Sequence, residues 1–246
     1  MVNSLTVAIY FLPYLHCMQH LILLHGATGA KRQLEPFADI LQAGFTIHLI
    51  NFSGHGGEPV PDAKFSVELF AEDVISYMQK NQITKADIFG YSMGGYVAMY
   101  MAKHYTEKVD RVITLATKFH WDEATAAKEV RMLDAGTIQQ KVPVFAEQLS
   151  SRHSPNDWKK VLTKTIELLT ALGSKNILQP EDYSNITVPC FIMLGDRDKM
   201  VTLDETVSVY KQLPAAQLAV LPNTPHPVEQ VNPQLLAYMI KQYLVR

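Results

Sequence analysis

A serine flanked by glycines is the first feature of this sequence that suggests chemistry. Gly90-Tyr91-Ser92-Met93-Gly94 follows one apolar run and precedes a second run of helix-forming residues. At a tight turn from a strand into a helix, a Cβ on either flanking residue would collide with the neighbouring elements, so glycine is favoured there. Such a turn lifts the Ser92 hydroxyl clear of a sheet and aims the Met93 amide at an oxyanion on the substrate.

The pentapeptide alone is weak evidence, because three fixed positions match by chance in roughly one chain of this length in ten. Its place at a predicted junction of strand and helix strengthens the prediction. A nucleophilic Ser92 also needs a base to take its proton, an acid to support that base, and a second amide for the oxyanion. The rest of the chain therefore has to bring these groups to the same place.

A histidine and a pair of aspartates further along the chain can complete this set. His226 lies between two prolines, which stiffen its loop, and an imidazole is a suitable general base at neutral pH. Asp196 and Asp198 both follow an apolar run that ends at Gly195. An Asp directly after a Gly often binds the amides of its own turn, so we favour Asp198 as the acid and keep Asp196 as the alternative.

The elements that must position these residues alternate between strands and helices. Short apolar runs predict buried parallel strands, and helical spacing or capping residues predict helices between them. The predicted strands are 20–24, 45–50, 87–90, 111–116, 188–194 and 218–221. The predicted helices are 32–43 and those that begin near residues 66, 96, 202 and 232. In such a sheet, functional groups gather beyond the carboxyl ends of the strands, which is where all the candidate residues fall.

Capping residues mark the start of three helices. Ser66 and Asn232 are predicted N-caps, and Pro233 suits the first helical position. Thr202 and Glu205 have the spacing of a capping box, in which each side chain bonds to the backbone amide of the other residue.

The alternation stops between about residues 118 and 182. We predict helices at 124–133, 144–149 and 158–172 and no strand. This segment is interpreted as a helical cap inserted into one discontinuous core of residues 1–117 and 183–246. Its aromatic side chains either face the substrate or pack the cap on the core, and both interpretations stay open. They are Phe119, Trp121, Phe145 and Trp158.

Composition limits the classes of function. The chain has 246 residues, of which 48% are apolar, and 22 Lys and Arg nearly balance 24 Asp and Glu. No basic stretch suggests nucleic acid or an anionic membrane surface. The apolar run 5–12 has no Lys or Arg before it and ends at Pro13, which favours an edge strand or hairpin over a signal peptide. Two cysteines without a motif favour a reducing, cytoplasmic location.

Taken together, these motifs resemble the α/β-hydrolase family. The residues that carry the resemblance are His25-Gly26-Ala27, Gly54-His55-Gly56, the segment Gly90 to Gly95, Gly195-Asp196-Arg197-Asp198 and His226. It implies an α/β-hydrolase fold, with a mostly parallel central sheet flanked by helices. It also implies Ser92 as nucleophile, His226 as base, an acid after the seventh strand, and the amides of Ala27 and Met93 as the oxyanion hole. The sequence departs from the family pattern at two places. Asn51 stands where the family often has Asp, and residues 223–225 stand where the family often has a glycine-rich run.

We therefore expect a cofactor-free serine hydrolase that attacks a small carboxylic ester, lactone or thioester and forms an acyl-enzyme. Two alternatives remain: carbon–carbon bond hydrolysis or lyase chemistry with the same triad, and a ligand-binding protein with little turnover. The partner is expected to be a small-molecule substrate. The physiological substrate and the oligomeric state are not specified by the sequence.

The remaining histidines are expected to be structural. His25 is expected to orient the oxyanion loop, and His55 to support its glycine-rich loop. No histidine has the spacing of metal ligands, so no metal site is predicted. This interpretation covers His16, His20, His48, His104, His120 and His153.

Overall fold

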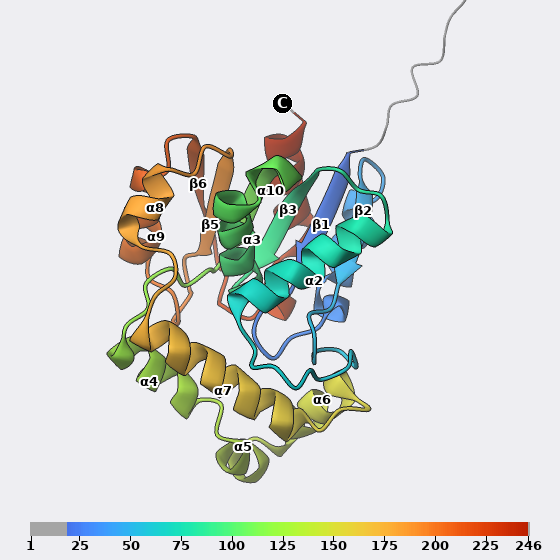
Figure 1. Cartoon of the computed structure of the whole chain (residues 1–246), viewed down its shortest axis with the longest axis vertical. Coiled ribbons are helices and arrows are strands. Elements are labelled where there is room, and N and C mark those ends of the chain that lie inside the picture. Colours follow the sequence, from blue (N-terminus) through green and yellow to red (C-terminus); the bar gives the residue numbers. More distant parts are fainter. Residues whose placement is uncertain (1–18, 246) are drawn as a thin grey trace, which may run out of the picture.

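A computed structural model describes residues 19–245, so the strand or hairpin predicted for residues 5–12 lies outside the described residues. Residues 19–245 form one sheet of six strands in the order β2-β1-β3-β4-β5-β6 (Figure 1). Every neighbouring pair is parallel. The strands are β1 (His20–Leu24), β2 (Thr46–Ile50), β3 (Ala86–Tyr91), β4 (Val109–Leu115), β5 (Cys190–Gly195) and β6 (Ala216–Leu221). The predicted α/β-hydrolase fold is confirmed.

The strands are apolar on both sides because helices cover both faces of the sheet. Ile22 and Leu24 of β1 join a buried cluster on one face, whereas Leu21 and Leu23 join a cluster on the other. The first face is covered by α2 (Val67–Lys80), α3 (Met93–His104), α8 (Pro180–Ser184) and α9 (Leu203–Gln212), and the second by α1 (Glu35–Leu41) and α10 (Pro233–Leu244). Alternate residues of each strand therefore belong to different halves of the core.

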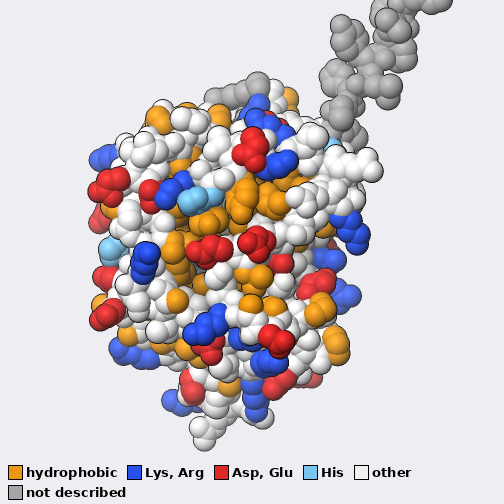
Figure 2. Space-filling view, in the orientation of Figure 1, with side chains coloured by type: hydrophobic (Ala, Val, Ile, Leu, Met, Phe, Trp, Pro, Cys, Tyr) orange, Lys and Arg blue, Asp and Glu red, His pale blue; other side chains and the backbone are white. Residues whose placement is uncertain are grey.

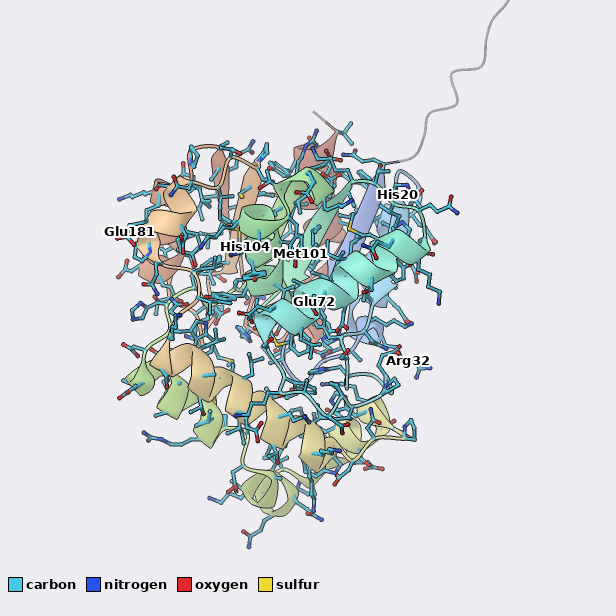
Figure 3. The ribbon with its side chains drawn as sticks, in the orientation of Figure 1. His20, Arg32, Glu72, Met101, His104 and Glu181 are labelled. Atoms are coloured by element: carbon cyan, nitrogen blue, oxygen red, sulfur yellow. The ribbon has the colours of Figure 1, made fainter. Side chains whose placement is uncertain are left out.

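Helices α2 and α3 illustrate where apolar and charged residues lie and how a helix start is capped. Figure 3 labels Met101 on α3, which is fully buried, and Glu72 on α2, which is exposed. Ser66 caps α2 as predicted, because its side chain accepts a hydrogen bond from the Leu69 amide at 3.1 Å. Asn232 caps α10 in the same way, with the amides of Gln234 and Leu235 as donors.

Two helices do not start where they were predicted to start. The segment predicted as one helix over 32–43 begins as the 3₁₀ turn η1 (Lys31–Leu34) and continues as the shorter helix α1. The helix predicted after Gly95 begins at Met93, so Ser92 is the only residue between β3 and α3. Two glycines in the first turn of a helix concealed its start, since glycine is a poor helix former. Two further 3₁₀ turns are η2 (Thr106–Lys108) and η3 (Val228–Gln230).

The predicted capping box at the start of α9 is half formed. Thr202 caps the helix by accepting a hydrogen bond from the Glu205 amide at 3.2 Å. The Glu205 carboxylate does not close the box, and instead accepts hydrogen bonds from the amides of Phe119 at 2.7 Å and His120 at 2.8 Å. The carboxylate therefore ties α9 to the loop after β4, a contact that local spacing does not encode.

Helices fill the segment between β4 and β5, and no strand occurs between residues 118 and 182. They are α4 (Glu123–Arg131), α5 (Ala135–Lys141), α6 (Pro143–His153) and α7 (Trp158–Ser174), followed by α8. Helix α5 was not predicted, because its sequence is short and polar. The helices α4 to α7 lie beyond the ends of the strands to which the arrows point (Figure 1). The predicted cap boundary at residue 182 falls inside α8, so the division between cap and core stays a prediction.

The cap helices share a small apolar cluster of their own and also pack on the core. Ile138, Leu149 and Trp158 belong to the cap cluster, whereas Leu168 and Leu172 of α7 join the cluster on the α2 and α3 face. Lys, Arg, Asp and Glu side chains are interspersed on the face drawn in Figure 2. Within residues 19–245, no helix is long and apolar enough to cross a membrane.

Candidate active site

The backbone at Ser92 is strained because one residue turns the chain from β3 into α3. Its φ is 52° and its ψ is −117°, a conformation that non-glycine residues rarely adopt and that costs about 1–3 kcal/mol. A Cβ on Gly90 would run into the backbone of Gly94, so the turn closes only with glycine at these positions. The turn is also held from β4, since the Ser92 amide donates to the Leu115 carbonyl at 2.9 Å.

Asp198 and His226 meet in a hydrogen bond of 2.8 Å, with the ring Nδ1–H donating to Oδ2 of the carboxylate. The Asp198 side chain is only 1% exposed. Its other oxygen accepts hydrogen bonds from the amides of Met200 and Val201. Burial alone would raise the pKa of Asp198, but the hydrogen bonds from His226 and the two amides hold the pKa below its ordinary value. The carboxylate therefore fixes the imidazole with Nε2 as the nitrogen free to accept a proton.

Asp196, the alternative acid, has a different environment. Its carboxylate accepts a hydrogen bond from the Thr224 amide at 3.0 Å, and its side chain is 37% exposed. The Arg197 amide donates to the Thr224 carbonyl, so the two loops are joined twice. Asp196 thus supports the segment 223–225, where the sequence departs from the family pattern, and the structure places Asp198 rather than Asp196 beside His226.

The amides of Ala27 and Met93 are free to bind a negative oxygen. Ala27 follows β1, and Met93 is the first residue of α3, whose N-terminal amides have no partner within the helix. Neither N–H donates a hydrogen bond to any acceptor in residues 19–245. Both residues border the cavity that Ser92 and His226 also border.

That cavity has a volume of about 740 Å³ and lies between the carboxyl ends of the strands and the cap. Of the four cap aromatics, Trp121 and Phe145 line it, whereas Phe119 and Trp158 are buried in the apolar clusters. Several methionines contribute to its wall, namely Met93, Met132 and Met200. Within the described chain, the hydrogen bond of the His226 ring is the one to Asp198, and none joins the ring to the Ser92 hydroxyl.

Two consecutive cap residues hold the loop that carries Ala27. The carbonyl of Thr28 accepts hydrogen bonds from Arg152 Nη1 and from His153 Nε2, both at 3.0 Å. Thr28 needs such support because its φ is 54°, in the left-handed region. We call Arg152 and His153 the cap clamp. No sequence signal marked either residue, since the contact spans more than 120 positions.

Buried histidines complete the support of this loop. His25 donates from Nδ1 to the Gly26 carbonyl and accepts at Nε2 from the Phe52 amide, while the Gly56 amide donates to His153 Nδ1. Burial lowers the pKa of His25 to about 3 and that of His153 to about 4. Both rings are therefore neutral at physiological pH, and the expectation that His25 orients this loop agrees with its contacts.

Other buried side chains support the site from outside the predicted set. The Tyr91 hydroxyl donates to the His226 carbonyl at 2.9 Å, and the Thr117 hydroxyl donates to the Ser92 carbonyl at 3.1 Å. His55 is fully buried against Phe65 and Phe70, as expected for a structural residue. Asn51 accepts from the Lys31 amide and donates to the Gly56 carbonyl, so it braces two loops.

Comparisons with known proteins identify the family. The family model of the alpha/beta hydrolase fold matches residues 19–164. Pimeloyl-[acyl-carrier protein] methyl ester esterase of Vibrio parahaemolyticus is 26% identical over 228 residues, which cover 84% of this chain and 86% of that protein. 2-(Acetamidomethylene)succinate hydrolase of Mesorhizobium japonicum is 21% identical over 243 residues, covering 91% and 87%.

Solved structures show the same fold. The enol-lactonase from Burkholderia xenovorans LB400 has a TM-score of 0.75 at 17% identity, covering 93% of this chain and 92% of that one. The family model spans more than half of the sequence and includes the Ser92 turn and the Ala27 loop. The chain is therefore an α/β hydrolase and belongs to the α/β hydrolase fold family.

Proposed function

We propose that this chain is a serine hydrolase that cleaves a small carboxylic ester, lactone or thioester. The observation that carries the proposal is the hydrogen bond of 2.8 Å between His226 and the buried Asp198 carboxylate, at a cavity that Ser92 also lines. The pair of Asp198 and His226 supplies an oriented base. The strained turn supplies the hydroxyl of Ser92, a residue that belongs to neither the strand before it nor the helix after it.

The proposed reaction has two halves. Ser92 Oγ attacks the carbonyl carbon while His226 Nε2 takes its proton, and the resulting oxyanion is bound by the amides of Ala27 and Met93. Collapse of this intermediate breaks the bond to the leaving alcohol or thiol, which receives the proton from His226. A water molecule then gives a proton to His226 Nε2 and attacks the acyl carbon. The bond from that carbon to Ser92 Oγ breaks, His226 returns the proton to Oγ, and the acid is released.

The volume of the cavity and the known relatives support a small substrate. A volume of about 740 Å³ suits a small molecule rather than a polymer. Two of the compared relatives are named as an ester esterase and a hydrolase, and a structural neighbour is named as a lactonase. The steps above use only groups of this chain and water.

A fluorophosphonate probe tests the proposal directly. The probe and short-chain p-nitrophenyl esters are applied to wild-type protein, to Ser92→Ala and to Ser174→Ala, a control at an exposed serine. We expect labelling and turnover in the wild type and the control, and neither in Ser92→Ala. Equal labelling of Ser92→Ala would contradict the assignment of the nucleophile. Absence of labelling in all three would favour proton-transfer chemistry or ligand binding, the alternatives left open by the sequence.

A further inference from the structure

We propose that the cavity contains a polar subsite, formed by Lys118 and Glu129, that binds a neutral hydrogen-bond donor of the substrate, a hydroxyl or an amide N–H. The inference rests on the proposed function, because it specifies the substrate class of the same cavity. Lys118 lies in the loop between β4 and α4, and Glu129 lies on α4. Both side chains line the cavity that Ser92 borders.

The Glu129 carboxylate is buried without the hydrogen bonds that such a group needs. Its side chain is 5% exposed, and its Oε1 has no hydrogen-bond partner among the described residues. The nearest cation is Lys118 Nζ, which lies 3.6 Å from this oxygen, beyond hydrogen-bond distance. A buried carboxylate that lacks hydrogen bonds is costly, so the presence of Glu129 in the cavity wall requires an explanation.

Glu205 is a second carboxylate near Lys118, and it does accept hydrogen bonds. It also approaches Lys118, at 4.0 Å, but it accepts hydrogen bonds from two backbone amides. Lys118 in turn donates to the Met200 carbonyl at 2.6 Å. One lysine is therefore shared among a carbonyl and two carboxylates, and of the two carboxylates only Glu129 has an oxygen that is buried without a hydrogen-bond partner among the described residues.

The charges select the kind of group that fits. A second cation is disfavoured because Lys118 Nζ already lies close to Glu129. A neutral donor avoids this repulsion and supplies the missing hydrogen bond. Hydroxyl and amide N–H groups are neutral donors of this kind.

The subsite is tested with pairs of esters that differ only in a terminal methyl or hydroxyl group. One series varies the acyl chain of p-nitrophenyl esters, and the other varies the alcohol of butyrate esters. We expect the hydroxyl member to be preferred in kcat/KM at one chain length of one series. In Glu129→Leu this preference should fall by about 10- to 100-fold, because a hydrogen bond to a charged group is lost. Glu129→Gln should retain part of it.

The matched control is Glu123→Leu, which removes an exposed glutamate from the same helix. It should keep the wild-type preference, and thermal unfolding checks that each variant is folded. A methyl preference at every length in the wild type, or a hydroxyl preference that survives Glu129→Leu, would overturn the subsite. Either result would assign Glu129 to a structural contact between cap and core.

A binding experiment separates this inference from the proposed function. The same ester pairs are titrated into Ser92→Ala and into Ser92→Ala with Glu129→Leu, by calorimetry. Tighter binding of the hydroxyl member that depends on Glu129 supports the subsite even if wild-type protein hydrolyses no ester. Equal binding of both members to both proteins overturns it even if the ester is hydrolysed.

Discussion

Asp196 and Asp198 differ in the groups that donate hydrogen bonds to their carboxylates. Two residues apart in the sequence, they share a loop after β5, yet one carboxylate binds a backbone amide at the surface and the other binds the His226 ring in the interior. An oriented acid holds the imidazole in the tautomer that can accept the serine proton and stabilises the imidazolium that forms. Only Asp198 has the geometry for this role.

We therefore expect Asp198→Asn to lower kcat by about 10³- to 10⁴-fold, the range known for the equivalent change in serine proteases. The matched change Asp196→Asn keeps an oxygen that can accept from Thr224, so kcat should fall less than about tenfold. Steady-state kinetics with an ester substrate on both variants gives the comparison. A larger loss in Asp196→Asn than in Asp198→Asn would reverse the assignment.

Residues with a local signature could be identified from sequence, whereas those defined by distant contacts could not. Ser92 was predictable because glycine spacing reflects a steric requirement within five residues. Positions after apolar strands predicted that the loop that carries both aspartates would meet the loop of His226, and the structure places Asp198 beside the ring. Tyr91 and His153 carried no such signature, because the carbonyls that they bind lie 135 and 125 positions away.

At the scale of elements, helix α6 of the cap controls a loop of the core. Its last residues, Arg152 and His153, donate to the carbonyl of Thr28, one residue beyond the amide proposed for the oxyanion hole. A peptide held at this carbonyl has a fixed orientation, and the strained φ of Thr28 would otherwise relax. The cap clamp therefore links the position of the cap to the loop that carries the amide proposed for the oxyanion hole.

We expect His153→Phe to lower kcat by about 10- to 100-fold with a smaller change in KM, since a poorly aligned oxyanion donor acts mainly on the transition state. His153→Gln keeps a side-chain donor for Thr28 and an acceptor for Gly56, and should recover most of the loss. Affinity for a trifluoromethyl ketone, which forms a bound oxyanion, should fall in parallel with kcat. Equal kinetics in the Phe variant and the wild type would remove the clamp from the mechanism.

The elements themselves followed from sequence where their pattern was local. Apolar runs located all six described strands, and Ser66 and Asn232 marked helix starts correctly. Helix α5 was missed because its seven residues carry one buried apolar side chain, Ile138, and too little periodicity. The side chain of Glu205 was misassigned because a tertiary contact outcompeted the local capping box.

At the scale of the whole molecule, the parallel sheet explains why residues far apart in sequence converge. All six described strands run the same way, so the loops after β1, β3, β5 and β6 emerge at one edge, where the cap closes over them. The predicted parallel direction of the strands was thus sufficient to expect that the candidate groups share a site. The cap contacts depend on side-chain packing over long sequence distances, which periodicity does not specify.

The buried histidines between cap and core make the stability of the molecule depend on pH. Burial keeps His25 and His153 neutral in the folded state by lowering their pKa to about 3 and about 4, from 6.5 in the unfolded chain. Below pH 6.5 the unfolded state therefore binds more protons than the folded state, and the free energy of unfolding falls as the pH falls toward 4. Each such histidine contributes a slope of up to about 1.4 kcal/mol per pH unit.

Denaturant unfolding at several pH values between 7 and 4.5 measures this slope. We expect a shallower loss of unfolding free energy in His153→Gln than in the wild type, because glutamine preserves the two hydrogen bonds but takes up no proton in the unfolded chain. The control is His120→Gln, which removes a histidine whose side chain is 68% exposed. Parallel curves for His153→Gln and the wild type would mean that His153 is protonated equally in both states. Protonation in the folded state would remove the Nδ1 acceptor of the Gly56 amide, whereas the Nε2–H donor to the Thr28 carbonyl would remain.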